Sequence, residues 1–257
     1  MSLNLSFAEV GTGPPLVILH GLFGSRRNWA SLARQLGETH RVFTLDLRNH
    51  GDSPWSETMS YREMAEDVGT FLGSHGLDGA TLMGHSMGGK TAMLLALEEG
   101  DLVSRLIVVD IAPVAYAHTH LPYIKAKQAV DLDAAARRSE VDQVLQEAIP
   151  DPGLRGFLLH NLVTEAGRLR WRINLQALHD NMDDLVGYPD DLDGLSYGGA
   201  TLFLAGAASD YVQTDHLPRI RALFPAAEID AIAGAGHWVH AEQPQAFLAR
   251  VQAFLAV

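Results

Sequence analysis

Residues 84–88 are the part of this chain whose types and spacing most clearly suit chemistry. They read Gly-His-Ser-Met-Gly and follow the short apolar run 81–83. A serine flanked by glycines at this spacing is typical of a nucleophile elbow, a sharp strand-to-helix turn that exposes the hydroxyl. The flanking glycines suit a crowded backbone that larger residues would obstruct. We therefore expect Ser86 to act as the nucleophile in acyl transfer.

The base that such a serine needs is expected near the C-terminus. A serine hydroxyl is a weak nucleophile at neutral pH and depends on an adjacent base. His237 follows the sequence Gly234-Ala235-Gly236, after the last apolar run that suits a strand. This order along the chain, serine first and histidine last, is usual for the elbow motif. His240 is the nearby alternative, but we interpret it as a polar residue before the helix that Pro244 opens.

The acid that would orient this histidine has two candidates. Asp110 ends the apolar run 106–109, where a carboxylate is costly unless it has a partner. Asp210 lies in the loop after the run 201–204, the usual region for the acid, but one position beyond the expected slot at Ser209. We favour Asp110 as the acid and keep Asp210 as the alternative.

Two backbone N–H groups are expected to stabilise the negative charge that develops on the substrate. Met87 directly follows the serine and begins the expected helix, so its N–H is the first candidate. The second is expected in residues 20–24, His-Gly-Leu-Phe-Gly, which follow an apolar run. Leu22 is the favoured donor there, and Phe23 is the alternative.

Strand and helix patterns alternate along most of the chain. Apolar runs predict strands at residues 3–9, 15–19, 41–45, 80–83, 106–109, 201–204 and 228–232. Helical spacing of apolar residues predicts helices at 29–36, 61–72, 87–99, 217–224 and 245–255. Repeated units of this kind indicate a mostly parallel sheet with helices on both faces. The segment 46–54 is expected to be a hydrogen-bonded turn with a structural role.

Residues 113–197 interrupt this alternation. They carry helical patterns at 123–130, 133–148, 152–164 and 174–185, without a convincing strand. We predict a helical lid inserted after strand 6, with residues 1–112 and 198–257 forming the core. The aromatic residues expected to bind substrate are Phe23, Tyr116, Tyr123 and Trp238.

Composition narrows the class of protein. The chain has 257 residues, no cysteine and a net charge of −12, which disfavours nucleic acid and anionic membranes as partners. No apolar run is long enough for a membrane helix, and the first residues lack a signal-peptide pattern. We expect a cytoplasmic monomer or homodimer. His118 and His120 have no nearby carboxylate in the sequence, so we expect exposed polar residues and no metal site.

Together these motifs resemble the α/β-hydrolase family over almost the whole chain. The segments Arg48-Asn49-His50-Gly51 and Asp110-Ile111-Ala112-Pro113 are more discriminating, and with them the chain is similar to YbfF-type bacterial esterases, which are related to abhydrolase-domain-containing protein 11. The resemblance implies the α/β-hydrolase fold, here expected as a mostly parallel eight-stranded sheet with the lid. That subfamily lacks the aspartate of the late loop, which favours Asp110, although this chain departs from it by carrying Asp210.

The resemblance also implies a reaction. We expect hydrolysis of carboxylic esters or acyl thioesters, through an acyl-enzyme on Ser86 with His237 as base, on a small-molecule substrate and without metal or organic cofactor. Two alternatives stay open. One is a carbon–carbon bond hydrolase or haloperoxidase-like enzyme on the same residues, and the other is a ligand receptor with slow turnover.

Overall fold

The main sheet of the computed structural model, which describes residues 2–256, has seven strands in the order β1-β3-β2-β4-β5-β8-β9. The edge strand β1 is antiparallel to β3, and the other neighbouring pairs are parallel. The strands are β1 (Phe7–Val10), β2 (Pro15–Leu19), β3 (Arg41–Leu45), β4 (Ala80–His85), β5 (Val103–Val109), β8 (Ala200–Gly206) and β9 (Ala227–Ile232). The α/β-hydrolase fold is thereby confirmed, and so are its seven individually predicted strands, except that the first begins at Phe7 and not at residue 3.

The expectation of an eighth strand is wrong for residues 2–256. The chain ahead of β1 bonds to loops and to a helix instead of a neighbouring strand. The Leu3 N–H donates to the Asp67 carboxylate at 2.6 Å, and the Ser6 N–H donates to the Ser53 hydroxyl at 2.8 Å. Residues 3–6 are thus bonded to α2 and to the loop after β3, and among the described residues no strand lies beyond β1 at this edge of the sheet.

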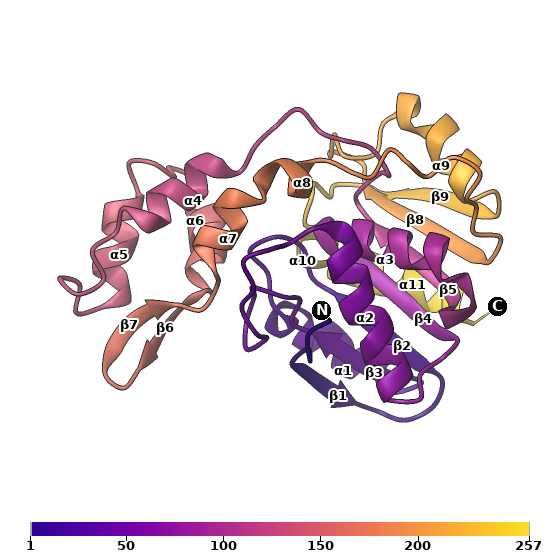
Figure 1. Ribbon diagram of the computed structural model, residues 1–257, viewed down its shortest axis with the longest axis horizontal. Helices are drawn as coiled ribbons and strands as arrows, with labels where there is room; N and C mark the ends of the chain where they lie inside the picture. The colour runs from indigo at the N-terminus through magenta and orange to yellow at the C-terminus, as the bar shows by residue number, and fades with distance from the viewer. Residues whose placement is uncertain (1, 257) are drawn as a thin grey trace.

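Both faces of the sheet are buried under helices (Figure 1). In β2, Val17 and Leu19 belong to one hydrophobic core while Leu16 and Ile18 belong to the other. Alternate residues of a strand point to opposite faces, so a strand covered on both sides is apolar throughout. The first core includes residues of α2 (Tyr61–Ser74), α3 (Met87–Glu98) and α9 (Leu217–Leu223), and the second includes residues of α1 (Ala30–Leu36) and α11 (Pro244–Leu255).

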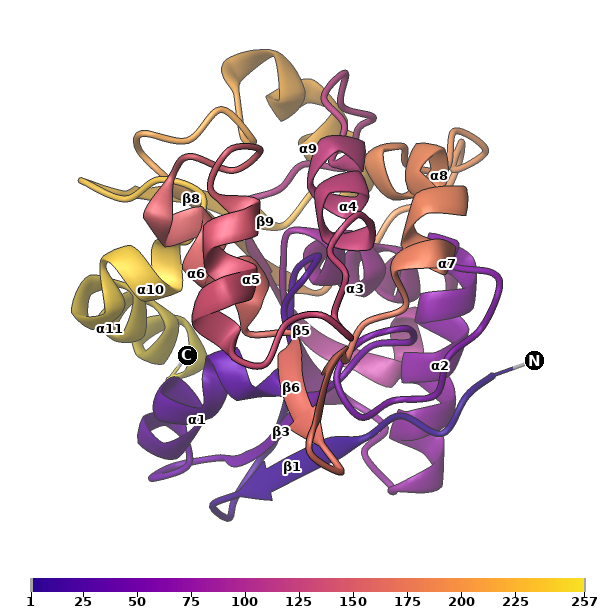
Figure 2. The same cartoon turned by 90° about the vertical axis from the view of Figure 1, so that its left-hand side faces the viewer.

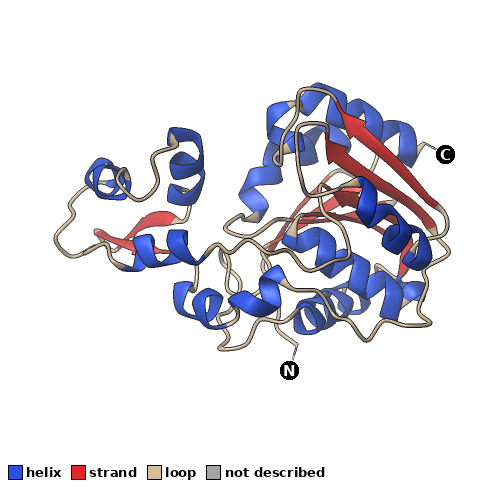
Figure 3. Ribbon diagram, turned by 90° about the horizontal axis from the view of Figure 1, so that it is seen from above, coloured by secondary structure: helices blue, strands red, loops and turns tan. Residues whose placement is uncertain are grey.

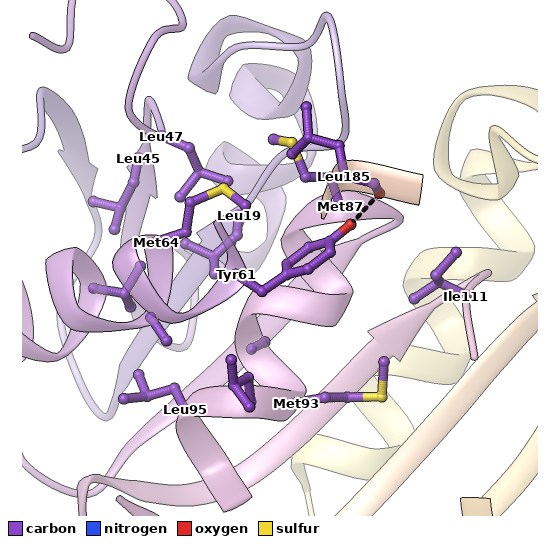
Figure 4. Close-up of a cluster of buried hydrophobic side chains, with 14 of the residues drawn as sticks. Leu19, Leu45, Leu47, Tyr61, Met64, Met87, Met93, Leu95, Ile111 and Leu185 are labelled. Atoms are coloured by element: carbon purple, nitrogen blue, oxygen red, sulfur yellow. Dashed lines mark hydrogen bonds between the residues drawn. The ribbon is translucent and has the colours of Figure 1, made fainter. Parts of the chain in front are cut away.

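The packing of α2 and α3 against the sheet fixes the helix that follows Ser86. Figure 4 shows Met64 of α2 and Met93 of α3 in the same cluster as Leu19 and Leu45 of the strands. The helix α2 begins at a capping box, in which the Ser60 hydroxyl accepts from the Glu63 N–H and the Glu63 side chain accepts from the Ser60 N–H. The first turn of α2 is therefore fixed, and α2 in turn packs against α3, the helix that begins next to Ser86.

The chain between β5 and β8 leaves the sheet, and we propose to treat residues 113–197 as the lid; this segment is called the insertion below. It lies to one side of the sheet in Figure 1 and in the view from above in Figure 3, and Figure 2 places it in front of the core. Its elements are α4 (Leu121–Gln128), α5 (Arg138–Leu145), α6 (Pro152–Leu159), β6 (Leu162–Glu165), β7 (Arg168–Trp171), α7 (Leu175–Asp180) and α8 (Met182–Val186).

Two expectations about the insertion are wrong. It follows β5, the fifth strand along the chain, because the sheet lacks the extra N-terminal strand. It also contains a β-hairpin where a helix was predicted to continue to residue 164, since α6 ends at Leu159. Ala166 and Gly167 both have positive φ, 49° and 79°, as a tight two-residue hairpin turn requires. The apolar run that enters β6 does not distinguish strand from helix.

Candidate active site

Ser86 lies at the tip of the turn between β4 and α3, with φ 52° and ψ −118°. The Ser86 N–H donates to the Val109 carbonyl at 3.0 Å, which ties the turn to β5. A Cβ on Gly84 would lie 2.1 Å from the Gly88 carbonyl oxygen, and a Cβ on Gly88 would lie 2.6 Å from the His20 carbonyl oxygen. Both flanking glycines are therefore required for this turn to close.

The structure brings Ser86, His237 and Asp110 together from three separate loops. The Ser86 Oγ lies 3.1 Å from His237 Nε2, and His237 Nδ1 donates to Asp110 Oδ2 at 2.7 Å. Asp110 directly follows β5 and is fully buried, whereas His237 follows β9 and is partly exposed. A hydroxyl, an imidazole and a buried carboxylate in this order can move a proton off the hydroxyl.

The Asp110 carboxylate has two further donors, one at the end of β8 and one in the loop that follows it. The Gly206 N–H donates to Oδ1 at 2.9 Å, and the Ser209 hydroxyl donates to Oδ2 at 2.5 Å. Asp210, the alternative acid, is exposed, and its carboxylate makes no hydrogen bond or ion pair within residues 2–256. Ser209 stands at the position where the sequence suggested an acid, and it donates a hydrogen bond to the carboxylate of Asp110 instead. That position was the signal in the sequence for this role.

The two candidate oxyanion donors, Leu22 and Met87, line one small cavity beside Ser86. Among the described residues, neither N–H has a hydrogen-bond partner. The alternative donor, Phe23, differs, because its N–H donates to His50 Nε2 at 3.3 Å. The geometry therefore leaves the Leu22 N–H, and not that of Phe23, available to a substrate.

Ser86 lies between two cavities. The larger has a volume of about 320 Å³, and its walls include Phe23, Tyr123, Phe157 and Trp238. The smaller has a volume of about 20 Å³ and contacts Tyr116. Each aromatic residue that the sequence proposed for substrate binding thus faces one of the two cavities.

Other aromatic side chains fix His237. The Tyr211 ring stacks on the His237 ring with centroids 3.9 Å apart. His85 Nε2 donates to the His237 carbonyl oxygen at 2.8 Å, and burial holds the pKa of His85 well below its usual value, so the ring is neutral. This contact gives the histidine inside the elbow motif a definite task, which is to hold the loop that carries His237.

His240 lies ahead of the helix that Pro244 opens, as expected, and its side chain is buried. It lies in α10 (Val239–Glu242), and its ring stacks on Trp29 with centroids 4.2 Å apart. Burial, and next the nearby His237, lower the pKa of His240 to about 3. The Ser86 hydroxyl therefore has His237 Nε2 as its acceptor, and His240 packs against Trp29 and His85.

His118 and His120 line the larger cavity. His118 is exposed and hydrogen-bonds through Nε2 to the Tyr211 hydroxyl at 3.0 Å, whereas burial lowers the pKa of the partly exposed His120 to about 4. Within residues 2–256, no group of three or more histidine, cysteine or carboxylate side chains is placed to hold a metal ion. In the same part of the chain, every helix is too short or too polar to cross a membrane.

Comparison with known proteins supports the interpretation of the fold. The sequence profile of the alpha/beta hydrolase fold matches residues 14–156. Mouse sn-1-specific diacylglycerol lipase ABHD11 is 46% identical over 100% of this chain and 85% of its own length. The esterase YbfF of Escherichia coli is 37% identical over 94% of this chain and 92% of its own length.

The fold of this chain also matches that of a solved structure. A marine microorganism esterase is 40% identical, with a TM-score of 0.95 over 98% of this chain and 100% of its own. The resemblance to YbfF-type esterases is thus confirmed. On this fold and these relatives, the chain belongs to the α/β-hydrolase family and is a hydrolase.

Proposed function

We propose that this protein is a serine hydrolase that cleaves carboxylic esters or acyl thioesters through an acyl-enzyme on Ser86. The observation that carries the proposal is the continuous series of hydrogen bonds from Ser86 through His237 to Asp110. This series ends at a cavity with mainly apolar walls, which include Leu154, Phe157 and Trp238. The names of the relatives, esterase and diacylglycerol lipase, support an ester as the bond that is cleaved.

Acylation begins when His237 Nε2 takes the proton of the Ser86 hydroxyl. The Oγ forms a bond to the carbonyl carbon of the substrate, and the carbonyl π electrons move to its oxygen. The N–H groups of Met87 and Leu22 donate to this oxyanion, and a donor of this kind is worth about 100- to 1000-fold in turnover. The oxyanion then re-forms the carbonyl, and the leaving alcohol or thiol takes the proton from His237.

Deacylation repeats these steps with water. His237 removes a proton from a water molecule, whose oxygen attacks the acyl carbon, and the Ser86 oxygen leaves with that proton. Asp110 accepts the Nδ1–H of His237 throughout, so Nε2 is the nitrogen that faces Ser86. The buried carboxylate also stabilises the imidazolium that forms in each half-reaction.

Hydrolysis of p-nitrophenyl esters, from acetate to long acyl chains, tests the proposal. We expect turnover by the wild type and a loss of about 10⁵- to 10⁶-fold in kcat for Ser86→Ala, as for other catalytic serines. Ser31→Ala removes an exposed hydroxyl in α1 and is the matched control, expected to keep wild-type turnover. Full activity in Ser86→Ala, or no hydrolysis of any ester by the wild type, would contradict the proposal. The second result would favour the carbon–carbon hydrolase and receptor alternatives.

A further inference from the structure

We propose that Asn161, a residue of the insertion, positions the oxyanion donor of the core. The loop of residues 20–24, called the oxyanion loop below, carries the Leu22 N–H that would bind the oxyanion. Asn161 and His50 hold the residue next to it, Phe23, from opposite sides. The insertion would then set the rate of the chemical step as well as the shape of the pocket. This inference rests on the proposed function, because it assumes that Leu22 stabilises an oxyanion during attack by Ser86.

The backbone of Phe23 needs such support. Its φ is 62°, a left-handed conformation that a residue with a side chain adopts at a cost of about 1–3 kcal/mol. Strain of this kind persists only where surrounding contacts enforce it. The Phe23 side chain is buried, so the contacts that hold it come from the protein and not from solvent.

On the core side, His50 accepts the hydrogen bond from the Phe23 N–H. The His50 ring is fully buried, and its Nδ1 donates to the Arg48 carbonyl oxygen at 2.9 Å. With a proton on Nδ1 only, Nε2 is free to accept from Phe23, and burial keeps the pKa of His50 well below its usual value. His20 holds the start of the oxyanion loop in the same way, because its Nε2 accepts the Leu47 N–H at 3.0 Å.

On the insertion side, Asn161 donates to the other end of Phe23. Its Nδ2 lies 2.7 Å from the Phe23 carbonyl oxygen, and the side chain is buried. Asn161 is itself anchored to the hairpin, since its own carbonyl accepts the Arg172 N–H at 2.7 Å. The bond therefore joins the oxyanion loop to an ordered element and not to a free loop.

A second contact from the insertion fixes the Phe23 ring. The Lys127 Nζ lies 5.2 Å from the centroid of that ring and 4.6 Å from the centroid of Trp171. The amino group of Lys127 donates to the Leu158 carbonyl oxygen at 3.4 Å, and its complete burial lowers the pKa of Lys127 to about 7. Phe23 is thus held at its N–H, its carbonyl and its ring, and two of these three contacts come from the insertion.

These contacts determine where the Leu22 N–H points. The Phe23 N–H belongs to the peptide that joins it to Leu22, and the Phe23 carbonyl belongs to the next peptide. The Leu22 N–H itself belongs to the preceding peptide, whose carbonyl, that of Gly21, accepts the Gly24 N–H at 2.9 Å. Because the Gly24 N–H lies in the same peptide plane as the Phe23 carbonyl, holding that carbonyl also restrains the peptide that carries the Leu22 N–H. An oxyanion donor acts by preorganisation, and a misplacement of about 1 Å at a reacting group can lower the rate by about 100-fold.

The test compares Asn161→Ala and the isosteric Asn161→Asp with the wild type on one short p-nitrophenyl ester. Neither variant has the amide N–H that the Phe23 carbonyl accepts. We expect kcat to fall by about 10- to 100-fold, with KM changed by less than about 3-fold. Gln176→Ala, an exposed change in α7, is the matched control and is expected to behave as wild type.

A further readout separates positioning from a general loss of structure. A trifluoromethyl ketone forms a tetrahedral adduct whose oxyanion occupies the hole. Its affinity should fall by the same factor as kcat/KM in both Asn161 variants, while the variants stay folded by circular dichroism. His50→Gln, which keeps a hydrogen-bond acceptor, should retain more of this affinity than His50→Leu. Wild-type kcat in folded Asn161 variants, or a loss confined to KM, would overturn the inference.

The outcomes also separate this inference from the proposed function. If Ser86→Ala abolishes hydrolysis but the Asn161 variants behave as wild type, the serine mechanism stands and only the positioning role fails. If Ser86→Ala keeps its activity, the proposed function fails first, and the adduct affinity has no bearing on catalysis.

Discussion

At the scale of single residues, the site depends on which carboxylate accepts the hydrogen bond from His237. Asp110 reaches it because the residue has φ 50° and follows β5 directly. This backbone conformation turns a side chain that follows an apolar strand toward the carboxyl edge of the sheet. Three donors, from Gly206, Ser209 and His237, then compensate the burial of its charge.

Replacing the acid should therefore abolish most of the activity. We expect Asp110→Asn to lower kcat by about 10⁴-fold, since the amide favours the wrong tautomer of the histidine. Asp210→Asn, an exposed neighbour in the same loop region, should stay within about 2-fold of wild type and serves as the control. Steady-state kinetics on a p-nitrophenyl ester decides between them. The reverse pattern would show that Asp210 is the acid.

The sequence indicated the residues of the site better than it indicated the residues that hold them in place. Ser86, His237 and Asp110 stand in local patterns of glycines and apolar runs, which a sequence displays directly. The bonds from Ser209 to Asp110 and from Asn161 to Phe23 join residues 99 and 138 positions apart. Nothing local marks such pairs, because they depend on how loops from different strands meet. The exception is Ser209, whose place in the usual acid slot was visible.

At the scale of secondary structure elements, a buried ion pair joins α2 to the loop after β3. Arg48 Nε lies 2.7 Å from Asp67 Oδ2, and Arg48 Nη2 lies 3.0 Å from Asp67 Oδ1. The two side chains are 1% and 0% exposed. Because Asp67 also accepts the Leu3 N–H, this carboxylate connects three segments around the base of the site.

Breaking this pair should be costly. We expect Arg48→Met to lower the free energy of unfolding by about 3–5 kcal/mol, since it leaves a buried carboxylate without its cation. Arg41→Met removes an arginine that is 41% exposed and paired with Glu9 at 2.7 Å, so this variant should unfold at nearly the same urea concentration as the wild type. Urea unfolding of the two variants gives the comparison. Similar losses in both would mean that Asp67 finds other partners.

The strands were predictable for a physical reason, and the hairpin was not. Strands buried on both faces are apolar throughout and stand out between turn residues, so β2, β4 and β5 were found within a few residues of their ends. The hairpin of β6 and β7 is partly exposed and short, and its apolar residues also suit a helix. Its turn depends on positive φ at Ala166, which the residue type does not suggest.

At the scale of the whole molecule, buried neutral histidines should make the fold sensitive to acid. Burial lowers the pKa of the buried His20, His50, His85 and His240, for His240 to about 3, and that of the partly exposed His120 to about 4. Above a pH of about 6.5, histidine is neutral in both the folded and the unfolded chain. Below it, the unfolded chain takes up protons that the folded chain excludes, so stability falls as the pH falls.

The expected loss is steep. Each such histidine contributes up to about 1.4 kcal/mol per pH unit below a pH of about 6.5, until its folded pKa is reached. In urea unfolding at pH 7.5, 6.5, 5.5 and 4.5, the free energy of unfolding should therefore fall with pH between 6.5 and 4.5. The slope there should correspond to the uptake of more than one proton on unfolding. His240→Phe keeps an aromatic ring against Trp29 and should reduce that slope by about one proton. A free energy of unfolding that stays constant from pH 7.5 to 4.5 would contradict the prediction.

The hydrogen bond between Asn161 and Phe23 also limits how this protein can be recombined with its relatives. A chimera that exchanges residues 113–197 for those of another hydrolase would bring new pocket walls. It would supply a donor to the Phe23 carbonyl only if a side chain with an N–H or O–H group stood in the turn after α6. Without that donor, the chimera would be slow on every substrate, whatever its new selectivity. A chimera that gains the new selectivity and keeps its rate therefore has to keep a hydrogen-bond donor at this one turn position.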